Sequence, residues 1–326
     1  MKTSTYTAFR GVFAALALAS ASLVHAQAWP ERVIKIIVPA PPGGNMDMPA
    51  RAFGRLLSKE VGQPVVVENK AGAGGAIGVQ AVLTSPPDGH TLLYTSANVL
   101  TEIPYAMKPP FHPMKDVLGV ALLTKYPYVL VVAADHPAKD LADLARGLKA
   151  APDASSFASP SAGTVAHFGG EILNRKLGVN MQHVPYYGTP PALNAVMGKQ
   201  VTMVLDSVVT SNALLKGGKL KALALAGTSR YAGLPQVPTF AEQGYTDFND
   251  FVGWQGIAVS PKVPAPIVEK IYAVSKRIAE QAEFREQISR LGFEPMVPES
   301  AQQFSKRLQA DYDQFGALNR TFMLKQ

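Results

Sequence analysis

The chain of 326 residues contains no cysteine. This absence excludes a disulfide framework, a zinc site with cysteine ligands, and a lipid anchor that would need a cysteine at a cleavage site. An exported protein of this composition has to be stabilised by its hydrophobic core. About 300 residues are enough for one large domain or two medium ones.

Long hydrophobic runs are also scarce, and the one that is present lies at the N-terminus. Lys2 and Arg10 supply a basic start, an apolar run covers residues 11–24, and Ala26 stands at the position that a signal peptidase reads. The run is shorter than the roughly 20 residues of a membrane-spanning helix. The pattern therefore favours a secretory signal peptide over residues 1–26, cleaved after Ala26, and not a transmembrane anchor.

The chain has no dense run of basic residues. Its 31 Lys and Arg outnumber 24 Asp and Glu, which gives a formal net charge of +7, but they are dispersed. Nucleic-acid binding requires a basic stripe or patch, so we expect no nucleic-acid partner. A mild positive potential instead favours the approach of small anions. No cluster of His, Asp and Glu indicates a metal site, and we expect neither a metal nor another cofactor.

Strand-like and helix-like segments alternate along most of the remaining chain. β-Branched runs are followed by amphipathic stretches of roughly 10 to 15 residues, which is typical of βαβ units in doubly wound sheets. The predicted strands cover residues 33–38, 65–69, 92–95, 128–133, 156–159, 182–185, 201–205 and 222–226. The predicted helices cover residues 47–61, 76–85, 141–150, 165–177 and 189–198, and nearly all of 266–324.

These segments form two α/β sets, and we expect each to be a lobe with a doubly wound sheet and flanking helices. Residues 27–127 and 251–326 are assigned to lobe 1 and residues 128–250 to lobe 2, with 254–259 as a crossing segment. Two such lobes form a cleft between them. Ligands of open α/β sheets bind where the carboxyl ends of strands meet helix N-termini, so we expect a binding site in that cleft.

The sharpest candidate for a binding element is the loop Pro39–Asp47, which runs from a strand into a helix. Gly43 and Gly44 leave backbone N–H groups accessible, and the helix N-terminus adds a partial positive charge. Both features suit a carboxylate. Asp47 fits poorly as a direct anion ligand, and we expect it to cap the helix or to orient waters on the loop. A loop that only turns the chain is the alternative.

A second glycine-rich stretch covers residues 72–78. It departs from the dinucleotide-binding pattern because Ile77 stands where the last glycine would fall, and because Thr95 and Ser96, not an acidic residue, end the following strand. The stretch therefore predicts a tight turn at a helix start and no nucleotide site.

A third loop, Ser159–Thr164, again links a strand end to a helix start. Ser161, Thr164 and the neighbouring backbone N–H groups can donate hydrogen bonds to a carboxylate from the second lobe. His167 lies one turn into the helix. It either touches the ligand or packs beneath the loop, and the sequence leaves both alternatives open.

Two other predicted strands end in polar side chains. Ser96 and Asn98 follow the strand at 92–95, and Asp206 follows the strand at 201–205. Asp206 can accept a hydrogen bond from a ligand hydroxyl or amine, or it can cap the next helix. These alternatives also stay open.

A hydrolase built on Ser161, His167 and Asp206 is the enzymatic alternative. A serine nucleophile of this kind sits in a G-x-S-x-G elbow, whereas the chain has Ser-Pro-Ser-Ala-Gly at 159–163. The sequence therefore predicts no catalytic residues and no enzyme.

Several motifs occur in a fixed order and spacing. They are PPGGNMDMPAR at 41–51, VENKAGAGGAIG at 67–78, PDGHTLL at 87–93, VPYYGTPPAL at 184–193 and VPTFAEQG at 237–244, followed by Trp254 and Gly256. Together they resemble the Bug family, also called the TctC family, of periplasmic solute receptors that serve tripartite tricarboxylate transporters. The resemblance covers nearly the whole chain beyond residue 26.

The resemblance implies a two-lobe periplasmic binding protein fold, the type II Venus flytrap, that closes on a ligand carboxylate. We expect a monomer in the periplasm that delivers a small organic carboxylate to the membrane subunits of such a transporter. A sensing subunit that passes its ligand signal to a sensor kinase would use the same binding chemistry and is the alternative. Ala40 and Pro41 stand where the family often has an aromatic residue, so the identity of the carboxylate stays open. The expected ligand-binding residues are Ala40, Pro41, Gly43, Gly44, Asp47, Ser96, Ser159, Ser161, Gly163, Thr164, His167 and Asp206.

Overall fold

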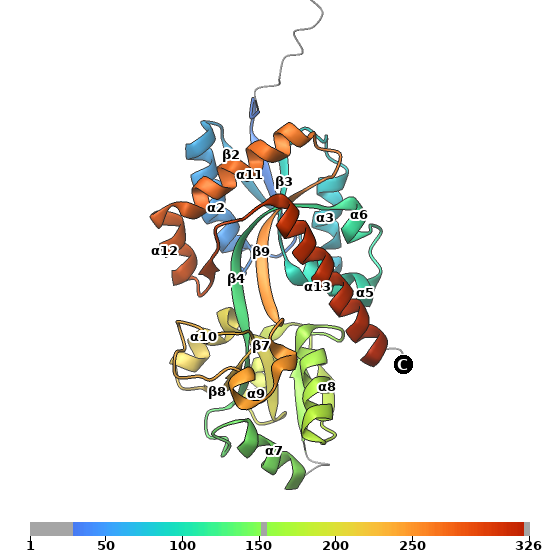
Figure 1. Cartoon of the computed structure of the whole chain (residues 1–326), viewed down its shortest axis with the longest axis vertical. Coiled ribbons are helices and arrows are strands. Elements are labelled where there is room, and N and C mark those ends of the chain that lie inside the picture. Colours follow the sequence, from blue (N-terminus) through green and yellow to red (C-terminus); the bar gives the residue numbers. More distant parts are fainter. Residues whose placement is uncertain (1–28, 151–154, 323–326) are drawn as a thin grey trace, which may run out of the picture.

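The structure is a computed structural model that describes residues 29–150 and 155–322. The predicted signal peptide lies outside the described residues. Figure 1 shows two α/β bodies, one above the other, with two long strands running between them. These strands are β4 (Leu118–Ala133) and β9 (Val252–Val259). The predicted α/β class and the two-lobe periplasmic binding protein fold are confirmed.

The upper body in Figure 1 is built on three parallel strands, β1 (Ile34–Val38), β2 (Val65–Asn69) and β3 (Thr91–Ser96). β1 lies between the other two, and β3 pairs antiparallel with β9. Every residue of β1 except Lys35 is buried, as expected for a strand covered on both faces. The helices of this body are α2 (Asp47–Val61), α3 (Ala76–Leu83), α4 (Ala97–Thr101), α5 (Ile103–Met107), α6 (Pro113–Asp116), α11 (Ala265–Glu280) and α12 (Ala282–Arg290).

The lower body has its own sheet, in which β4 is followed by β7 (Met203–Ser207), β5 (Ser156–Ser159) and β6 (Gln182–Pro185). β5 pairs parallel with both β6 and β7, whereas β7 and β8 (Leu220–Leu225) pair antiparallel with β4. The sheet is therefore mixed. Its helices are α7 (Leu141–Ala150), α8 (Val165–Leu177), α9 (Thr189–Met197) and α10 (Val208–Lys216).

β4 changes its partners where it passes from one body to the other. Its last residue paired with β9 is Pro127, which lies opposite Val252. From Tyr128 onward it pairs with β7, with Tyr128 opposite Ser207. One strand thus takes part in the sheets of both bodies, and it holds the residues on either side of this joint in fixed register.

The last helix, α13 (Ala301–Phe322), is a further connection between the bodies and follows the short strand β10 (Glu294–Pro295). Phe304 and Leu308, near its start, belong to the core of the first body. Phe315, near its end, belongs to the core of the second body. All of 251–326 was predicted to belong to one lobe, whereas α13 packs on the cores of both bodies.

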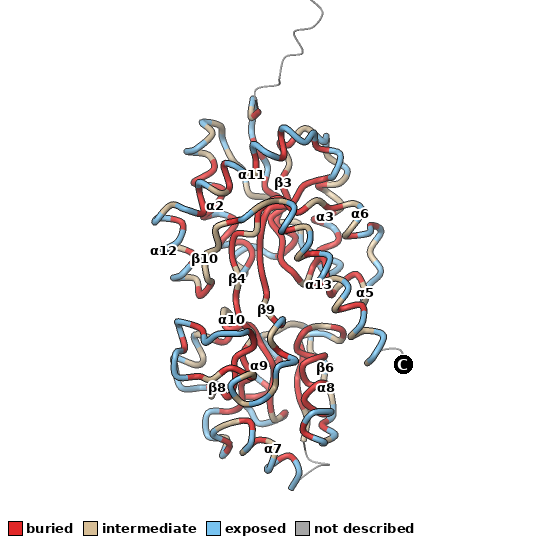
Figure 2. The backbone as a smooth tube through the Cα atoms, in the orientation of Figure 1, coloured by how far each residue is buried: buried red, intermediate tan, exposed pale blue. Residues whose placement is uncertain are grey.

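Buried residues follow the strands and the inner faces of the helices, as Figure 2 shows. The core of the first body is continuous from β1 to α11, and the sheet of the second body is covered on both faces by separate clusters. Within the described ranges, no helix is both long and apolar enough to cross a membrane.

Candidate functional site

A cavity of about 130 Å³ lies between the two bodies. It is bounded by the carboxyl end of β3, by the loop before α2 and by the start of α8, which are the regions where the sequence predicted a site. The first body contributes Asn45, Met46, Ser96, Asn98 and Glu102 to its wall.

The loop before α2 is held in shape by Asp47. This carboxylate is buried and accepts hydrogen bonds from Gly43 N at 2.8 Å, Arg51 Nε at 2.9 Å and Asn69 Nδ2 at 2.9 Å. Burial alone would raise the pKa of Asp47, but the hydrogen bonds from Arg51, Gly43 and Asn69 outweigh it and hold the pKa below its ordinary value. Because all these partners belong to the first body, Asp47 organises the loop.

The expectation that Asp47 caps α2 is corrected. The helix begins at Asp47 itself, and the capping position is occupied by Met46, which makes no side-chain cap. The carboxylate instead reaches back to the N–H of Gly43, whose φ of +76° is easily reached only by glycine. Asp47 therefore fixes the turn that precedes the helix.

The other expected residues of this loop lie beside the cavity and not in its wall. Ala40 is buried, and its carbonyl oxygen accepts a hydrogen bond from Asn69 Nδ2 at 3.1 Å. Pro41 and Gly43 are exposed, and Gly44 uses its carbonyl oxygen to start the helix. The loop meets the cavity through its last residues, Asn45 and Met46.

Ser96 lies in the cavity wall as predicted from the end of β3. It is buried, and its hydroxyl donates to Asn98 Oδ1 at 2.5 Å. The bond fixes the Asn98 carboxamide, so that its NH₂ group stays available as a donor.

The loop Ser159–Thr164 divides between the cavity and the interior of the second body. Thr164 lines the cavity with its neighbours Pro160 and Val165. Ser159 is fully buried and contacts His183, with 2.7 Å between Oγ and Nε2. Ser161 is exposed, and its hydroxyl donates to the carbonyl oxygen of Ala162 at 3.3 Å, so neither serine lies in the cavity wall.

His167 packs beneath this loop, one of the two alternatives left open by the sequence. Its ring stacks on that of His183 with 3.8 Å between centroids, and its Nδ1 accepts a hydrogen bond from Gly163 N at 3.1 Å. Burial lowers the pKa of His167, and burial together with the charge of His167 lowers the pKa of His183 to about 4. Both rings are therefore neutral at pH 7 and support the turn at Gly163.

Asp206 lies in the cavity wall at the end of β7. Its Oδ2 accepts hydrogen bonds from Thr210 Oγ1 and Ser211 Oγ, both at 2.6 Å, whereas the cap of α10 is the side chain of Ser207. Burial raises the pKa of Asp206 to about 6, although the two hydroxyl donors lower it in part. Of the two alternatives that the sequence left open for Asp206, the structure does not have the cap of α10, which is Ser207.

Glu102, between α4 and α5, is a cavity residue that sequence reasoning missed. It is 3% exposed, and its Oε2 accepts a hydrogen bond from Val165 N at 3.0 Å, across the gap between the bodies. Oε1 is buried and has no hydrogen-bond partner within the described residues. Burial raises the pKa of Glu102 to about 8.

Two tyrosines of β4, Tyr126 and Tyr128, complete the wall on either side of the joint between the bodies. Their rings lie 5.9 Å apart. Burial raises the pKa of both hydroxyls, which therefore stay protonated and can donate or accept hydrogen bonds.

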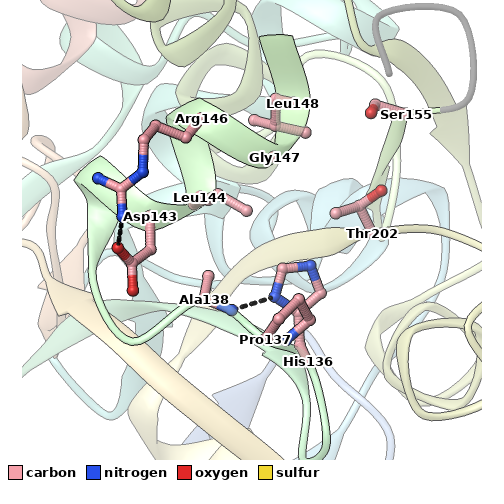
Figure 3. Close-up of a pocket in the computed structure, with 10 residues that line it drawn as sticks. All are labelled: His136, Pro137, Ala138, Asp143, Leu144, Arg146, Gly147, Leu148, Ser155 and Thr202. Carbon is pink, nitrogen blue, oxygen red and sulfur yellow. Dashed lines mark hydrogen bonds and ion pairs between the residues drawn. The ribbon is translucent and has the colours of Figure 1, made fainter. Parts of the chain in front are cut away.

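A larger cavity, of about 500 Å³, lies at the far end of the second body (Figure 3). It is bounded by Thr202 and Ser155, which precede β7 and β5, so it adjoins the amino ends of these strands. The sticks in Figure 3 show an ion pair of Arg146 with Asp143 on one side. Ligand sites of α/β folds lie at the carboxyl ends of strands, so we take the cavity between the bodies as the candidate site.

Comparisons with known proteins agree with this architecture. The sequence model of the family described as tripartite tricarboxylate transporter family receptor matches residues 50–324. BugT of Bordetella pertussis is 36% identical over 240 residues, which are 73% of each protein. The structure of MatC from Rhodopseudomonas palustris with bound malate is 32% identical with a TM-score of 0.74, covering 89% of this chain and 99% of MatC. An R. palustris structure with adipate is 25% identical with a TM-score of 0.79, and the match covers 90% of this chain and 98% of that protein.

Two α/β bodies with a cavity between them, together with the match to this receptor family, place the protein among the periplasmic solute-binding proteins. The chain belongs to the tripartite tricarboxylate transporter receptor family, the TctC or Bug family. Sequence analysis identified this family correctly. Within the part of the chain that the structure describes, no three His, Asp or Glu side chains gather closely enough to hold a metal ion.

Proposed function

We propose that this receptor binds a small organic carboxylate in the cavity between the bodies and delivers it to the membrane subunits of a tripartite tricarboxylate transporter. One observation carries the proposal: two helices, one from each body, begin at the cavity. Asn45 and Met46 lead into α2, and Thr164 and Val165 begin α8. Helix N-termini present N–H groups and a partial positive charge, which suit an anion. At α8 the N–H of Val165 is already donated to Glu102, so the start of α2 is the main anchor that we propose for the ligand carboxylate. The malate in MatC and the adipate in the R. palustris protein support a carboxylate.

The proposed mechanism is closure of the two lobes around the ligand. Residues 27–127 with 251–326, and residues 128–250, would move as lobes about the joint in β4. The end of α13, which packs on the core of the second body, would have to shift during this motion. A ligand that contacts both lobes favours the closed state because only that state makes both sets of contacts. The volume of about 130 Å³ suits a small metabolite, since pockets that hold drug-sized ligands measure roughly 300–1,000 Å³.

A binding role is favoured over catalysis by the surroundings of the candidate nucleophiles. The hydroxyl of Ser161 donates to Ala162, and the hydroxyl of Ser159, although close to His183, is fully buried. A general base has to lie within hydrogen-bond reach of an accessible nucleophile. We therefore propose a receptor and not a hydrolase.

The test is a thermal-shift screen followed by calorimetric titration of the purified protein with succinate, malate, adipate, glutarate and propionate. We expect at least one of these acids to raise the melting temperature. Asn98→Asp keeps an acceptor for Ser96 but adds a negative charge to the cavity, so it should weaken binding by about tenfold or more. Thr202→Asp, in the far cavity, is the matched control and should leave affinity unchanged. A screen in which no carboxylate stabilises the protein would contradict the proposal.

A role in uptake is tested separately in cells. Deletion of the gene should abolish uptake of the bound carboxylate, and the wild-type chain should restore uptake. Undiminished uptake, with loss of a transcriptional response to the same compound, would favour a sensor kinase as the partner instead.

A further inference from the structure

We propose that Glu102 and Asp206 form an acidic subsite, so that the ligand of this receptor is a carboxylate that also carries a protonated amine. The inference rests on the proposed function and specifies which class of carboxylate the cavity takes. The carboxylate of the ligand would face the loop before α2, and its ammonium group would lie between the two acidic side chains.

The first observation is that the protein places its own carboxyl group at the N-terminus of α8. Val165, the first residue of that helix, donates its N–H to Glu102 Oε2 at 3.0 Å. Sequence analysis assigned this helix start to the ligand carboxylate. A ligand anion at the same place would have to displace Glu102 from this N–H group.

The second observation is that the other carboxyl oxygen of Glu102, Oε1, has no hydrogen-bond partner within the described residues. This oxygen is buried and belongs to a residue that lines the cavity. A buried polar atom of this kind is costly unless it is paired. An N–H donor on a ligand in the cavity would supply the pair.

The third observation is the acidic group that faces the same cavity from the other body. Asp206 is 5% exposed, and its partners Thr210 and Ser211 are neutral hydroxyls. Across the described ranges, neither Glu102 nor Asp206 forms an ion pair with a Lys, Arg or His of the chain. Glu102, Asp206 and Tyr126 all line the same cavity. Burial raises the pKa of the Tyr126 hydroxyl, and the charges of Glu102 and Asp206 act in the same direction.

The raised pKa of Glu102 is that of a buried carboxyl group with no positively charged partner among the described residues. Burial, together with the negative charge of Asp311 on α13, raises its pKa to about 8. The other titratable groups facing it are Tyr126 and Tyr128 on β4 and Asp206 on β7, none of which is positive. An ammonium group would bind the ionised form and release a proton, whereas a ligand without an amine would accept a hydrogen bond from the protonated form.

The experiment compares matched ligand pairs by calorimetric titration of the full chain. The pairs are glycine and acetate, L-alanine and propionate, L-aspartate and succinate, L-glutamate and glutarate, and γ-aminobutyrate and butyrate. We expect the amine-bearing member of the best pair to bind at least tenfold more tightly. Titration at pH 7 in buffers of different ionisation enthalpy should show proton release on binding.

Two variants separate the acidic subsite from the rest of the cavity. Glu102→Gln and Asp206→Asn should each lower the affinity for the amine-bearing ligand by roughly 30-fold or more, because each removes one partner of a buried charge pair. The amine-free partner should lose much less affinity than the amine-bearing ligand in both variants, because it has no ammonium group to pair with the acidic side chains. Melting curves confirm that each variant is folded, and the two variants are independent of each other.

The outcomes distinguish this inference from the proposed function. The acidic subsite is wrong, and the carboxylate receptor stands, if amine-free carboxylates bind as tightly as their amine-bearing partners. The same conclusion follows if the two variants weaken the binding of both kinds of ligand equally. If no compound of either kind binds, both are wrong.

Discussion

The indole N–H of Trp254 donates a hydrogen bond to the carboxylate of Asp311, with 2.7 Å between Nε1 and Oδ2. The bond joins β9, which runs between the bodies, to α13, which packs on the cores of both. Asp311 also pairs with Arg307 at 2.7 Å, one turn earlier on the helix. The strand at the joint and the helix beside it are thus held together by one buried carboxylate.

Removal of this carboxylate should destabilise the protein. Asp311→Ala leaves the Trp254 N–H buried without an acceptor and Arg307 without its partner, which should lower the free energy of unfolding by about 2–4 kcal/mol. Urea denaturation measures the change. Asp313→Ala, at an exposed position of the same helix, should stay within about 0.5 kcal/mol of the wild type. Equal effects of the two substitutions would show that the Trp254–Asp311 bond does not matter for stability.

The stability of the unliganded protein should depend on pH through Glu102. Its pKa is about 8 in the folded state, above the ordinary value of 4.5, so the folded state holds a proton that the unfolded state releases between these values. The contribution of protonated Glu102 is fully present below about pH 4.5 and is lost as the pH rises through about 8.

Glu102→Gln removes this dependence. The variant should therefore gain stability relative to the wild type as the pH rises from about 4.5 to about 8, by on the order of 1–3 kcal/mol. Unfolding curves at several pH values measure the difference. Glu286→Gln, at an exposed position of α12, should show no such trend. A difference between Glu102→Gln and wild type that is constant over this pH range would contradict the burial of an ionisable Glu102.

Asp47 should affect binding without touching the ligand. Asp47→Asn keeps the size of the side chain but removes the charge that pairs with Arg51, and it weakens the acceptor for Gly43. We expect a loss of about 1–3 kcal/mol in stability and a weaker affinity for the carboxylate, because the loop before α2 is no longer fixed. Met48→Ala, next to it but exposed, is the control. Full affinity in a folded Asp47→Asn variant would show that loop order is not needed for binding.

The stacked histidines should make the second body sensitive to acid. The folded-state pKa values of His167 and His183 lie below the ordinary 6.5, to about 4 for His183. Stability contributed by the neutral rings should therefore be lost as the pH falls from about 6.5 to about 4. Two-dimensional NMR of the imidazoles should show both titrating below the ordinary pKa of 6.5, with His183 at about 4. Titration of either ring above pH 6.5 would contradict the neutral stack.

Segments whose local pattern agrees with their tertiary environment were predicted well. The helices at 47–61, 141–150 and 165–177 have the same bounds in the structure because their apolar faces repeat at helical spacing. The strand predicted at 128–133 is the second half of β4. Its first half, from Leu118, was missed because Thr124, Lys125 and Pro127 interrupt the apolar run and because its partner β9 lies far along the chain.

The site was predicted in outline. Ser96, Thr164 and Asp206 line the cavity, since residues at the carboxyl ends of strands gather at one edge of a sheet. Glu102 was missed because its contact with Val165 joins segments that only the fold brings together. A signal was present: Glu102 is the single charged residue between 97 and 107, in an otherwise uncharged stretch.

The central claim is that a small carboxylate binds between the two bodies. The measurement that tests it most directly is a crystal structure of the protein grown with the acid that stabilises it best in the thermal-shift screen. The account predicts ligand density in contact with Asn45 and Asn98 of one body and with Thr164 and Asp206 of the other. Density in the far cavity beside His136 and Thr202, with the cavity between the bodies filled by water alone, would contradict it.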